Sequence, residues 1–127
     1  MNFRHFNTSA GKLVLCGKSA EQNEEVVKFA LADEYVLHTA KPGSPFCVIK
    51  GKAAAEDIKE TAVFCASKSQ AWRDSKSDVL VHYFKGKDIF KESGMKIGTF
   101  GVKKFKAIKV KKGDIKRLIS SKEKENV

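Results

Sequence analysis

The sequence has no long apolar run, few cysteines and a deficit of acidic residues. No stretch of about 18 apolar residues occurs in the 127-residue chain, so we expect no membrane span. The opening residues, MNFRHFNTSAGK, lack the apolar core of a signal peptide, so we expect no export and a cytoplasmic location. Cys16, Cys47 and Cys65 form an odd set without a CxxC pair, which supports neither a disulfide framework nor a zinc ribbon. Each lies in an apolar run, as expected of a buried, reduced thiol.

The shortage of acid leaves a strongly basic protein. The chain has 25 Lys and Arg against 15 Asp and Glu, a formal net charge of +10. The excess gathers near the end, where residues 103–117 hold seven lysines, one arginine and one acid. A one-sided basic surface predicts a polyanionic partner, either nucleic acid or an anionic membrane. The alternative is a lysine-rich surface that is merely solvated.

Periodicity, turn residues and capping signals divide the chain into short elements. Ser19 is a good N-cap, and Gln22 completes a capping box three residues later. The expected elements, in chain order, are a hairpin over 2–18, a helix over 19–32, strands over 34–39 and 46–50 around a turn at 40–45, a helix over 53–72, a strand over 79–84, a glycine-punctuated loop over 85–101 with room for one short strand, a strand over 103–112 and a short helix over 113–123.

This order predicts the fold class α+β, a mixed, largely antiparallel sheet with two main helices packed on it, which we expect on one face. We expect a single domain over residues 1–119 and a disordered tail of mixed charge over 120–127. No internal repeat or linker divides the chain.

The stretch DEYVLHTAKPGSPFCVIK, residues 33–50, contains the most unusual placement. His38 ends a strand and opens a loop, where rigid scaffolds often present functional side chains. His5 and His82 lie inside strand-like runs, and we interpret them as surface or structural residues. The turn around Gly43 and Ser44 could hold a phosphate with its backbone N–H groups. A plain β-turn beside a packed histidine remains the alternative.

Two cations could contribute to such an anion site. Lys41 stands next to the turn, and Lys18 precedes the helix whose N-terminus favours anions. His38 could add a donor or stack on a base.

Signals for catalysis are weak. Ser44, His38 and Glu34 could act as nucleophile, base and orienter, but no GxSxG elbow is present. Residues 17–23 lack the upstream glycine of a phosphate-binding P-loop. His, Cys, Asp and Glu do not cluster at metal-ligand spacing, so we expect no metal, no cofactor and no small-molecule ligand.

Three ordered blocks resemble a known family, the RNA-binding domain of NFACT proteins (NFACT-R), in a free-standing form. The resemblance covers about residues 3–102. The matching residues of the first block are Thr8, Ser9, Gly11, Gly17, Lys18, Gln22 and Asn23. Those of the second block are Glu34, His38, Gly43 and Ser44, and those of the third are Lys91, Gly94 and Gly98.

The chain departs from the family pattern at several positions. Glu34 replaces the usual Asp, Val36 an aromatic residue and Phe46 a histidine, and the late block lacks the family's prolines. The missing histidine argues against a two-histidine mechanism or metal site.

The resemblance implies RNA binding, with larger members acting in ribosome-associated quality control on tRNA and the large ribosomal subunit. It therefore implies a translation-related module that binds tRNA, rRNA or other structured RNA, with the ribosome as a further expected partner and no membrane partner. The RNA-binding residues expected from the resemblance and from charge are Lys18, Asn23, Glu34, His38, Lys41, Gly43, Ser44, Lys91, Lys103, Lys104, Lys106 and Lys109. Two alternatives stay open: an RNA-processing or RNA-modifying enzyme using His38 with Glu34 and Ser44, and a ribosome-associated protein–protein adaptor.

Overall fold

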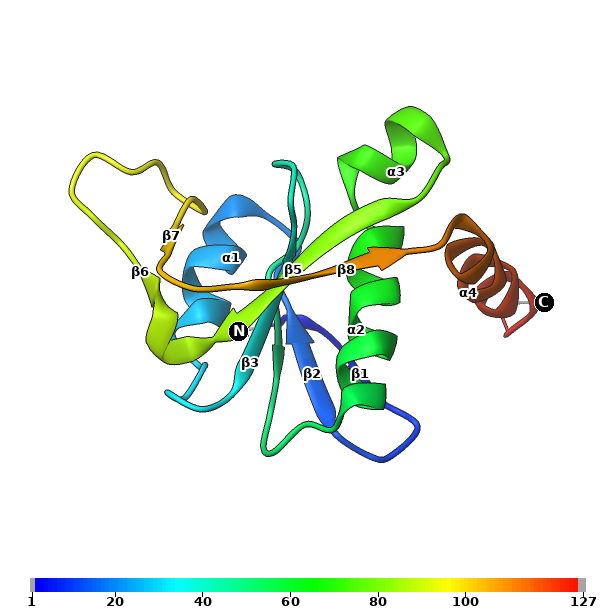
Figure 1. Ribbon diagram of the computed structural model, residues 1–127, viewed down its shortest axis with the longest axis horizontal. Helices are drawn as coiled ribbons and strands as arrows, with labels where there is room; N and C mark the ends of the chain where they lie inside the picture. Colours follow the sequence, from blue (N-terminus) through cyan, green and yellow to red (C-terminus); the bar gives the residue numbers. More distant parts are fainter. Residues whose placement is uncertain (1, 126–127) are drawn as a thin grey trace.

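A six-stranded antiparallel sheet organises the protein. The computed structural model describes the backbone of residues 2–125 and the side chains up to Ser121. The sheet order is β1-β2-β4-β3-β5-β8, and a separate two-stranded ribbon joins β6 to β7 (Figure 1). The elements are β1 (Arg4–Asn7), β2 (Leu13–Cys16), α1 (Ala20–Val27), β3 (Tyr35–Thr39), β4 (Cys47–Ile49), α2 (Ala55–Ser67), α3 (Gln70–Ser75), β5 (Val79–Lys85), the 3-10 turn η1 (Gly86–Asp88), β6 (Ile89–Phe90), β7 (Gly101–Val102), β8 (Lys106–Val110) and α4 (Lys112–Glu125). The α+β class is confirmed, with antiparallel pairing throughout this sheet.

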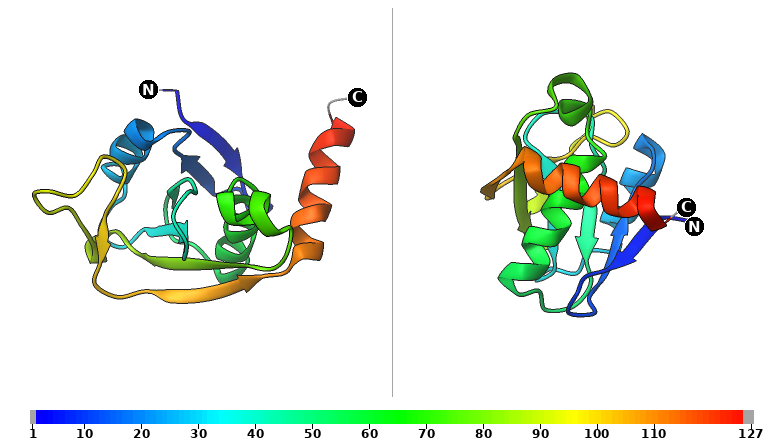
Figure 2. Two further views of the ribbon diagram at one scale, coloured as in Figure 1. Left: turned by 90° about the horizontal axis from the view of Figure 1, so that it is seen from above. Right: turned by 90° about the vertical axis from the view of Figure 1, so that its right-hand side faces the viewer.

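The two main helices lie on opposite faces of the sheet, which corrects the expectation of one covered face. Strand residues alternate between faces, so Leu37 and Val36 point to opposite sides. Leu37 belongs to the cluster built on α2, together with Ala62. Val36 belongs to the cluster built on α1, together with Val26. The strands β3 and β4 accordingly run between the two helices (Figures 1 and 2).

The first predicted helix begins as expected and ends early. The Ser19 hydroxyl accepts the N–H of Gln22, and the Gln22 side chain accepts the N–H of Lys18 at 3.0 Å. The helix stops at Val27 instead of continuing to residue 32. Beyond it the chain turns so that the N–H of Leu31 donates to the Glu34 carboxylate at 2.9 Å. That local contact takes the place of another helical turn.

The predicted helix over 53–72 is broken into α2 and α3. The buried Ser69 donates its hydroxyl hydrogen to the Ala66 carbonyl at 2.7 Å and accepts the N–H of Trp72 at 3.1 Å. Serine in this position caps a new helix instead of continuing the old one. The N–H of Gln70 then donates to the carbonyl of Gly43 at 2.7 Å, which ties α3 to the turn after β3.

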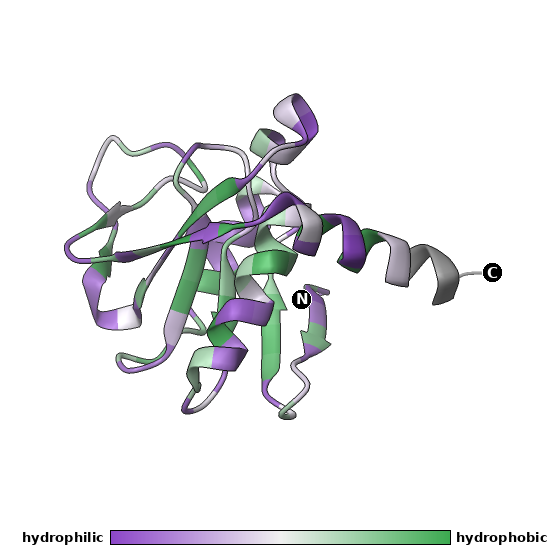
Figure 3. Cartoon of the chain, turned by 45° about the vertical axis from the view of Figure 1, so that its right-hand side comes forward, coloured by the Kyte–Doolittle hydropathy of each residue, from purple (hydrophilic) through white to green (hydrophobic). Residues whose placement is uncertain are grey.

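The C-terminal helix is longer than expected. Residues 120–125 continue α4 where we expected a disordered tail, and residues 126–127 lie outside the described part of the chain. The fully buried Ile115 anchors α4 in the α2 cluster, with Leu118 and Ile119 packed beside it. Figure 3 shows apolar residues along the central strands and both polar and apolar residues along α4. None of the described helices is long and apolar enough to cross a membrane.

Candidate nucleic-acid interface

A cleft of about 720 Å³ opens at the end of β3 where His38 lies. Its walls come from the start of α1, the loop between β3 and β4, α3, β5 and the segment leading into β7. The lining includes Arg4, Lys18, Asn23, His38, Gly43, Ser44, Phe46, Lys68, Arg73, His82, Gly98 and Phe100. The cleft therefore gathers segments from most of the chain around His38 and His82.

Two histidines lie side by side in this cleft. His38 on β3 and His82 on β5 are directly paired across the antiparallel ladder. The ring of His38 stacks on Phe46 at a centroid distance of 4.2 Å, and the ring of His82 stacks on Phe105 at 4.1 Å. His82, expected to be a surface or structural residue, thus shares the cleft with His38.

His38 is held in a neutral state. Burial lowers its pKa to about 4 despite the opposing effect of the Thr39 carbonyl, which lies 2.8 Å from Nδ1. A neutral ring that donates from Nδ1 has an acceptor at Nε2. Burial also lowers the pKa of His82. The two rings consequently offer hydrogen-bonding and stacking surfaces at neutral pH, whereas positive charge comes from other residues.

The loop between β3 and β4 is fixed by a buried amide. Asn23 on α1 accepts the N–H of Phe46 at 3.0 Å and donates to the Ser44 carbonyl at 3.4 Å. A Cβ atom on Gly17 would lie 2.1 Å from Oδ1 of Asn23, so that position requires glycine. Asn23, expected to contact RNA, therefore positions the loop that forms one wall of the cleft.

The Gly43–Ser44 turn is likewise rigid. Gly43 has a φ of +94°, and an added Cβ would lie 2.8 Å from Cβ of Gln70. The Ser44 hydroxyl accepts the N–H of Thr39 at 3.0 Å. Its role in the structure is to close the turn, and among the described residues it has no hydrogen bond to His38 that would resemble a nucleophile and its base.

Four cationic side chains line the cleft: Arg4, Lys18, Lys68 and Arg73. None of the lining residues, all of them within the described part of the chain, is acidic. Low-dielectric walls that carry charge of one sign focus the field and attract a counter-charged ligand. The geometry suits an anion with an aromatic group, because the rings of Phe100 and His82 lie among these charges.

Glu34 lies at the opposite end of β3 from His38, which corrects its expected role as orienter of that histidine. Its carboxylate accepts the N–H groups of Leu31 and Gly51 and binds the ammonium of Lys50 at 2.5 Å. Burial would raise its pKa, but these contacts together lower it. Glu34 thus orders the loops at its own end of the sheet.

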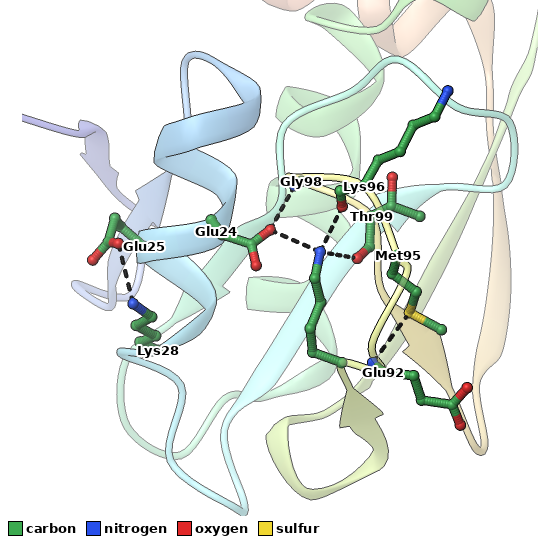
Figure 4. Close-up of polar contacts among 9 residues, drawn as sticks. Glu24, Glu25, Lys28, Glu92, Met95, Lys96, Gly98 and Thr99 are labelled. Atoms are coloured by element: carbon green, nitrogen blue, oxygen red, sulfur yellow. Dashed lines mark hydrogen bonds and ion pairs between the residues drawn. The ribbon is translucent and has the colours of Figure 1, made fainter.

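Figure 4 shows Glu24 of α1 beside Gly98 and Thr99 of the β6–β7 loop, and Lys91 fastens these two segments together. Its ammonium binds Glu24 at 3.1 Å and donates to the carbonyls of Lys96 and Thr99. The same carboxylate of Glu24 accepts the N–H of Gly98 at 2.5 Å. Because Gly98 and Thr99 line the cleft, Lys91 positions that wall, and its direct contact with RNA stays a prediction.

The lysines near the end of the sheet do not form one surface. Lys106 pairs with Tyr83 and Lys109 pairs with Leu80, so the two side chains point to opposite faces of β8. Lys103 and Lys104 lie in the exposed bend before β8. The expected basic strand is therefore split between two faces, and only its Lys109 side continues the face that carries the cleft.

The structure brings together part of the predicted set of RNA-binding residues. The predicted residues that line the cleft are Lys18, Asn23, His38, Gly43 and Ser44. Those that lie outside its lining are Glu34, Lys41, Lys91, Lys103, Lys104, Lys106 and Lys109. Sequence reasoning missed Arg4, Lys68, Arg73 and His82. The capping signal at Ser69 could have indicated that α3 begins there and presents Arg73 separately from α2. No sequence signal pointed to His82, because its neighbour comes from a distant strand.

A basic cleft with aromatic rings in its walls is typical of a nucleic-acid-binding domain. The family described as the NFACT protein RNA binding domain matches residues 2–104, and the chain belongs to that family. This membership supports a generic RNA-binding role.

One solved structure with the same fold is the C-terminal part of the fibronectin/fibrinogen-binding protein from Streptococcus suis. It is 25% identical, has a TM-score of 0.79, and the match covers 92% of this chain and 49% of that one. The present chain thus spans about half the length of that relative. No curated protein matches the sequence.

Among the described residues, no group of three or more His, Cys, Asp or Glu is arranged to hold a metal ion.

Proposed function

We propose that this protein binds structured RNA, with tRNA or rRNA as its partner, through the cleft beside His38. The observation that carries the proposal is the gathering of Arg4, Lys18, Lys68 and Arg73 around a cleft whose lining contains no acid. Family membership supports RNA as the class of polyanion. The setting we propose is translation or ribosome-associated quality control in the cytoplasm, where buried free thiols such as Cys16 and Cys47 stay reduced.

Within the cleft we assign the cations to phosphate groups and His38 to a base. A histidine with a pKa of about 4 carries no charge at neutral pH, so it contributes little to phosphate attraction. Its Nε2 acceptor instead suits an amino group on the edge of adenine, cytosine or guanine. Its Phe46-stacked ring is held in a fixed orientation for that contact.

This assignment favours binding over the enzymatic alternative. The carboxylate of Glu34 is engaged by Lys50 and two backbone N–H groups at the far end of β3. The hydroxyl of Ser44 accepts a backbone N–H of its own loop. Glu34, His38 and Ser44 are therefore not assembled as orienter, base and nucleophile.

The test is a measurement of affinity for tRNA as a function of salt. Changing Lys18 and Arg73 to glutamine should reduce affinity at least about tenfold and make the slope of log affinity against log salt shallower by about 2, one unit for each lost phosphate contact. The matched control changes Lys52 and Lys59, which are exposed and lie outside the cleft lining, to glutamine.

The control pair removes the same charge and should alter affinity much less. Equal losses in the two double variants would show that net charge, and not the cleft, attracts the RNA. A wild-type salt slope near zero would overturn RNA binding by the basic surface altogether. Thermal unfolding of each variant establishes that folded protein is being compared.

A further inference from the structure

Phe105 is an aromatic residue that the fold leaves in solvent. The residue is 53% exposed, although phenylalanine is one of the most apolar residue types. The ring is not loose, because it stacks on His82 with a centroid distance of 4.1 Å and an interplanar angle of 23°. It also lies just beyond residues 2–104, the part of the chain that matches the family.

The position of Phe105 joins it to the cleft. His82 lines the cleft, so the outer ring of the stack extends the cleft surface toward β8. Leu80 lies two residues from His82 on β5, shares its sheet face and is 44% exposed. Phe105, His82 and Leu80 form an apolar ledge beside the cleft.

Cations flank this ledge. Lys109 lies opposite Leu80 in the register of β5 and β8. Lys103 and Lys104 immediately precede Phe105 and are exposed. An aromatic ring stacked on one side, half-exposed and surrounded by lysines combines the two features that bind single-stranded nucleic acid: a stacking surface for a base and charges for its phosphates.

We propose that Phe105 stacks on an unpaired base of the RNA whose neighbouring nucleotide enters the cleft. The proposal rests on the proposed function, since it assumes that the cleft binds RNA, and it specifies the class of RNA: a structured RNA that presents a single-stranded loop or end. A base inside a duplex has both faces covered by its neighbours and offers none to a protein ring. An unpaired base has a free face, which is why protein aromatics recognise loops, bulges and ends.

The experiment compares two short RNAs of equal length, one without secondary structure and one a blunt duplex. We expect Phe105→Ala to weaken binding of the single strand about 5- to 150-fold, the loss of one stacked base. Binding of the duplex should change less than about twofold, because it engages the lysines alone. The salt slope should stay that of the wild type, since no charge is removed.

Phe105→Trp should preserve the affinity and report the stacking directly. The native Trp72 is 4% exposed, so a tryptophan at position 105 supplies the accessible indole. Its fluorescence should be quenched by the single strand beyond the change seen in the wild type. The control variant is Phe29→Ala, which removes a phenylalanine of similar exposure, 50%, outside the cleft lining and should leave both affinities unchanged.

The outcomes separate the two proposals. If the wild type binds neither of the two short RNAs and does not bind tRNA, the proposed function fails. If it binds them and Phe105→Ala has no effect, or weakens single strand and duplex equally, the stacking role is overturned while the cleft proposal stands. Unfolding of Phe105→Ala would be recognised in a thermal melt. In that case the affinity and the fluorescence quenching of Phe105→Trp decide whether position 105 stacks on a base.

Discussion

The two ends of strand β3 each carry a partly or fully buried titratable residue, and they differ in what surrounds it. At the start, Glu34 is 6% exposed and its carboxylate is surrounded by Leu31, Lys50 and Gly51. At the other end, His38 lines a cleft and has Thr39 as its hydrogen-bond partner. Both pKa values lie below the ordinary values of the groups. A perturbed pKa therefore marks both ends alike.

The difference lies in whether the protein itself supplies the contacts of the titratable side chain. The Glu34 carboxylate receives donors from three residues of the protein, so its contacts stabilise the fold. The His38 ring faces a space lined by cations and aromatic rings, so the contact it lacks can come from a ligand. Perturbed pKa values cluster at functional sites, but structural ion pairs perturb them too, and the surrounding geometry distinguishes the two cases.

The largest expected effect is on stability at the Glu34 end. Glu34→Ala should lower the free energy of unfolding by about 3–5 kcal/mol, because it strips the partner from Lys50 and leaves two backbone N–H groups without their acceptor. RNA affinity of the folded fraction should stay unchanged. Chemical denaturation and a binding titration on one preparation measure the two quantities.

Glu25→Ala is the matched control. Its ion pair with Lys28 is exposed on α1, with 39% and 67% of the two side chains accessible, and should contribute less than about 1 kcal/mol. Comparable destabilisation by the two variants would show that Glu34 is no more than a surface charge.

Next in size is the response of the His38 end to acid. The pKa of His38 is lowered by burial from 6.5 to about 4, so the unfolded chain binds a proton that the folded protein does not. Stability contributed by the neutral ring is present above pH 6.5 and falls as the pH drops toward 4, by up to about 3 kcal/mol. Urea unfolding at several pH values measures this loss.

His38→Gln isolates that contribution from other groups. The variant cannot titrate, so its stability should fall less steeply over the same pH range. The carboxylates of Glu34 and Asp57 titrate in both proteins and cancel in the comparison, whereas His82, paired with His38, acts on the pKa of His38 and so belongs to the measured difference. Parallel curves for the variant and the wild type would contradict the buried, neutral His38 described above.

The smallest of the three effects is on binding at the His38 end. His38→Ala should weaken RNA binding by about 1–3 kcal/mol, or ~5- to 150-fold, through the loss of one base contact. The affinity must be measured at fixed salt and corrected for the folded fraction by a thermal melt. A variant that melts several degrees lower while its folded fraction binds normally would make His38 a structural residue, like Glu34.

Local sequence signals were sufficient for much of the fold. The Ser19 cap, the strand over 35–39 and the turn at Gly43 follow from side-chain capping, β-branched residues and glycine, which act within a few positions of the chain. The blocks that resemble the NFACT family likewise lie in contiguous segments, and the family match over 2–104 agrees with them. Helix ends were less predictable. The N–H of Leu31 donates to Glu34 three residues on, and the N–H of Gln70 at the start of α3 donates to Gly43, which is distant in the sequence.

By itself, then, the sequence determined the α+β class, the basic charge and the presence of a strand end with His38, because each depends on composition or on neighbouring residues. Tertiary structure alone decided which groups meet there. The β3–β5 ladder places His82 beside His38, and the β5–β8 ladder sends Lys106 and Lys109 to opposite faces. Strand partners and register arise from burying both sheet faces at once, under α1 and α2, and no local pattern in this chain specifies that pairing.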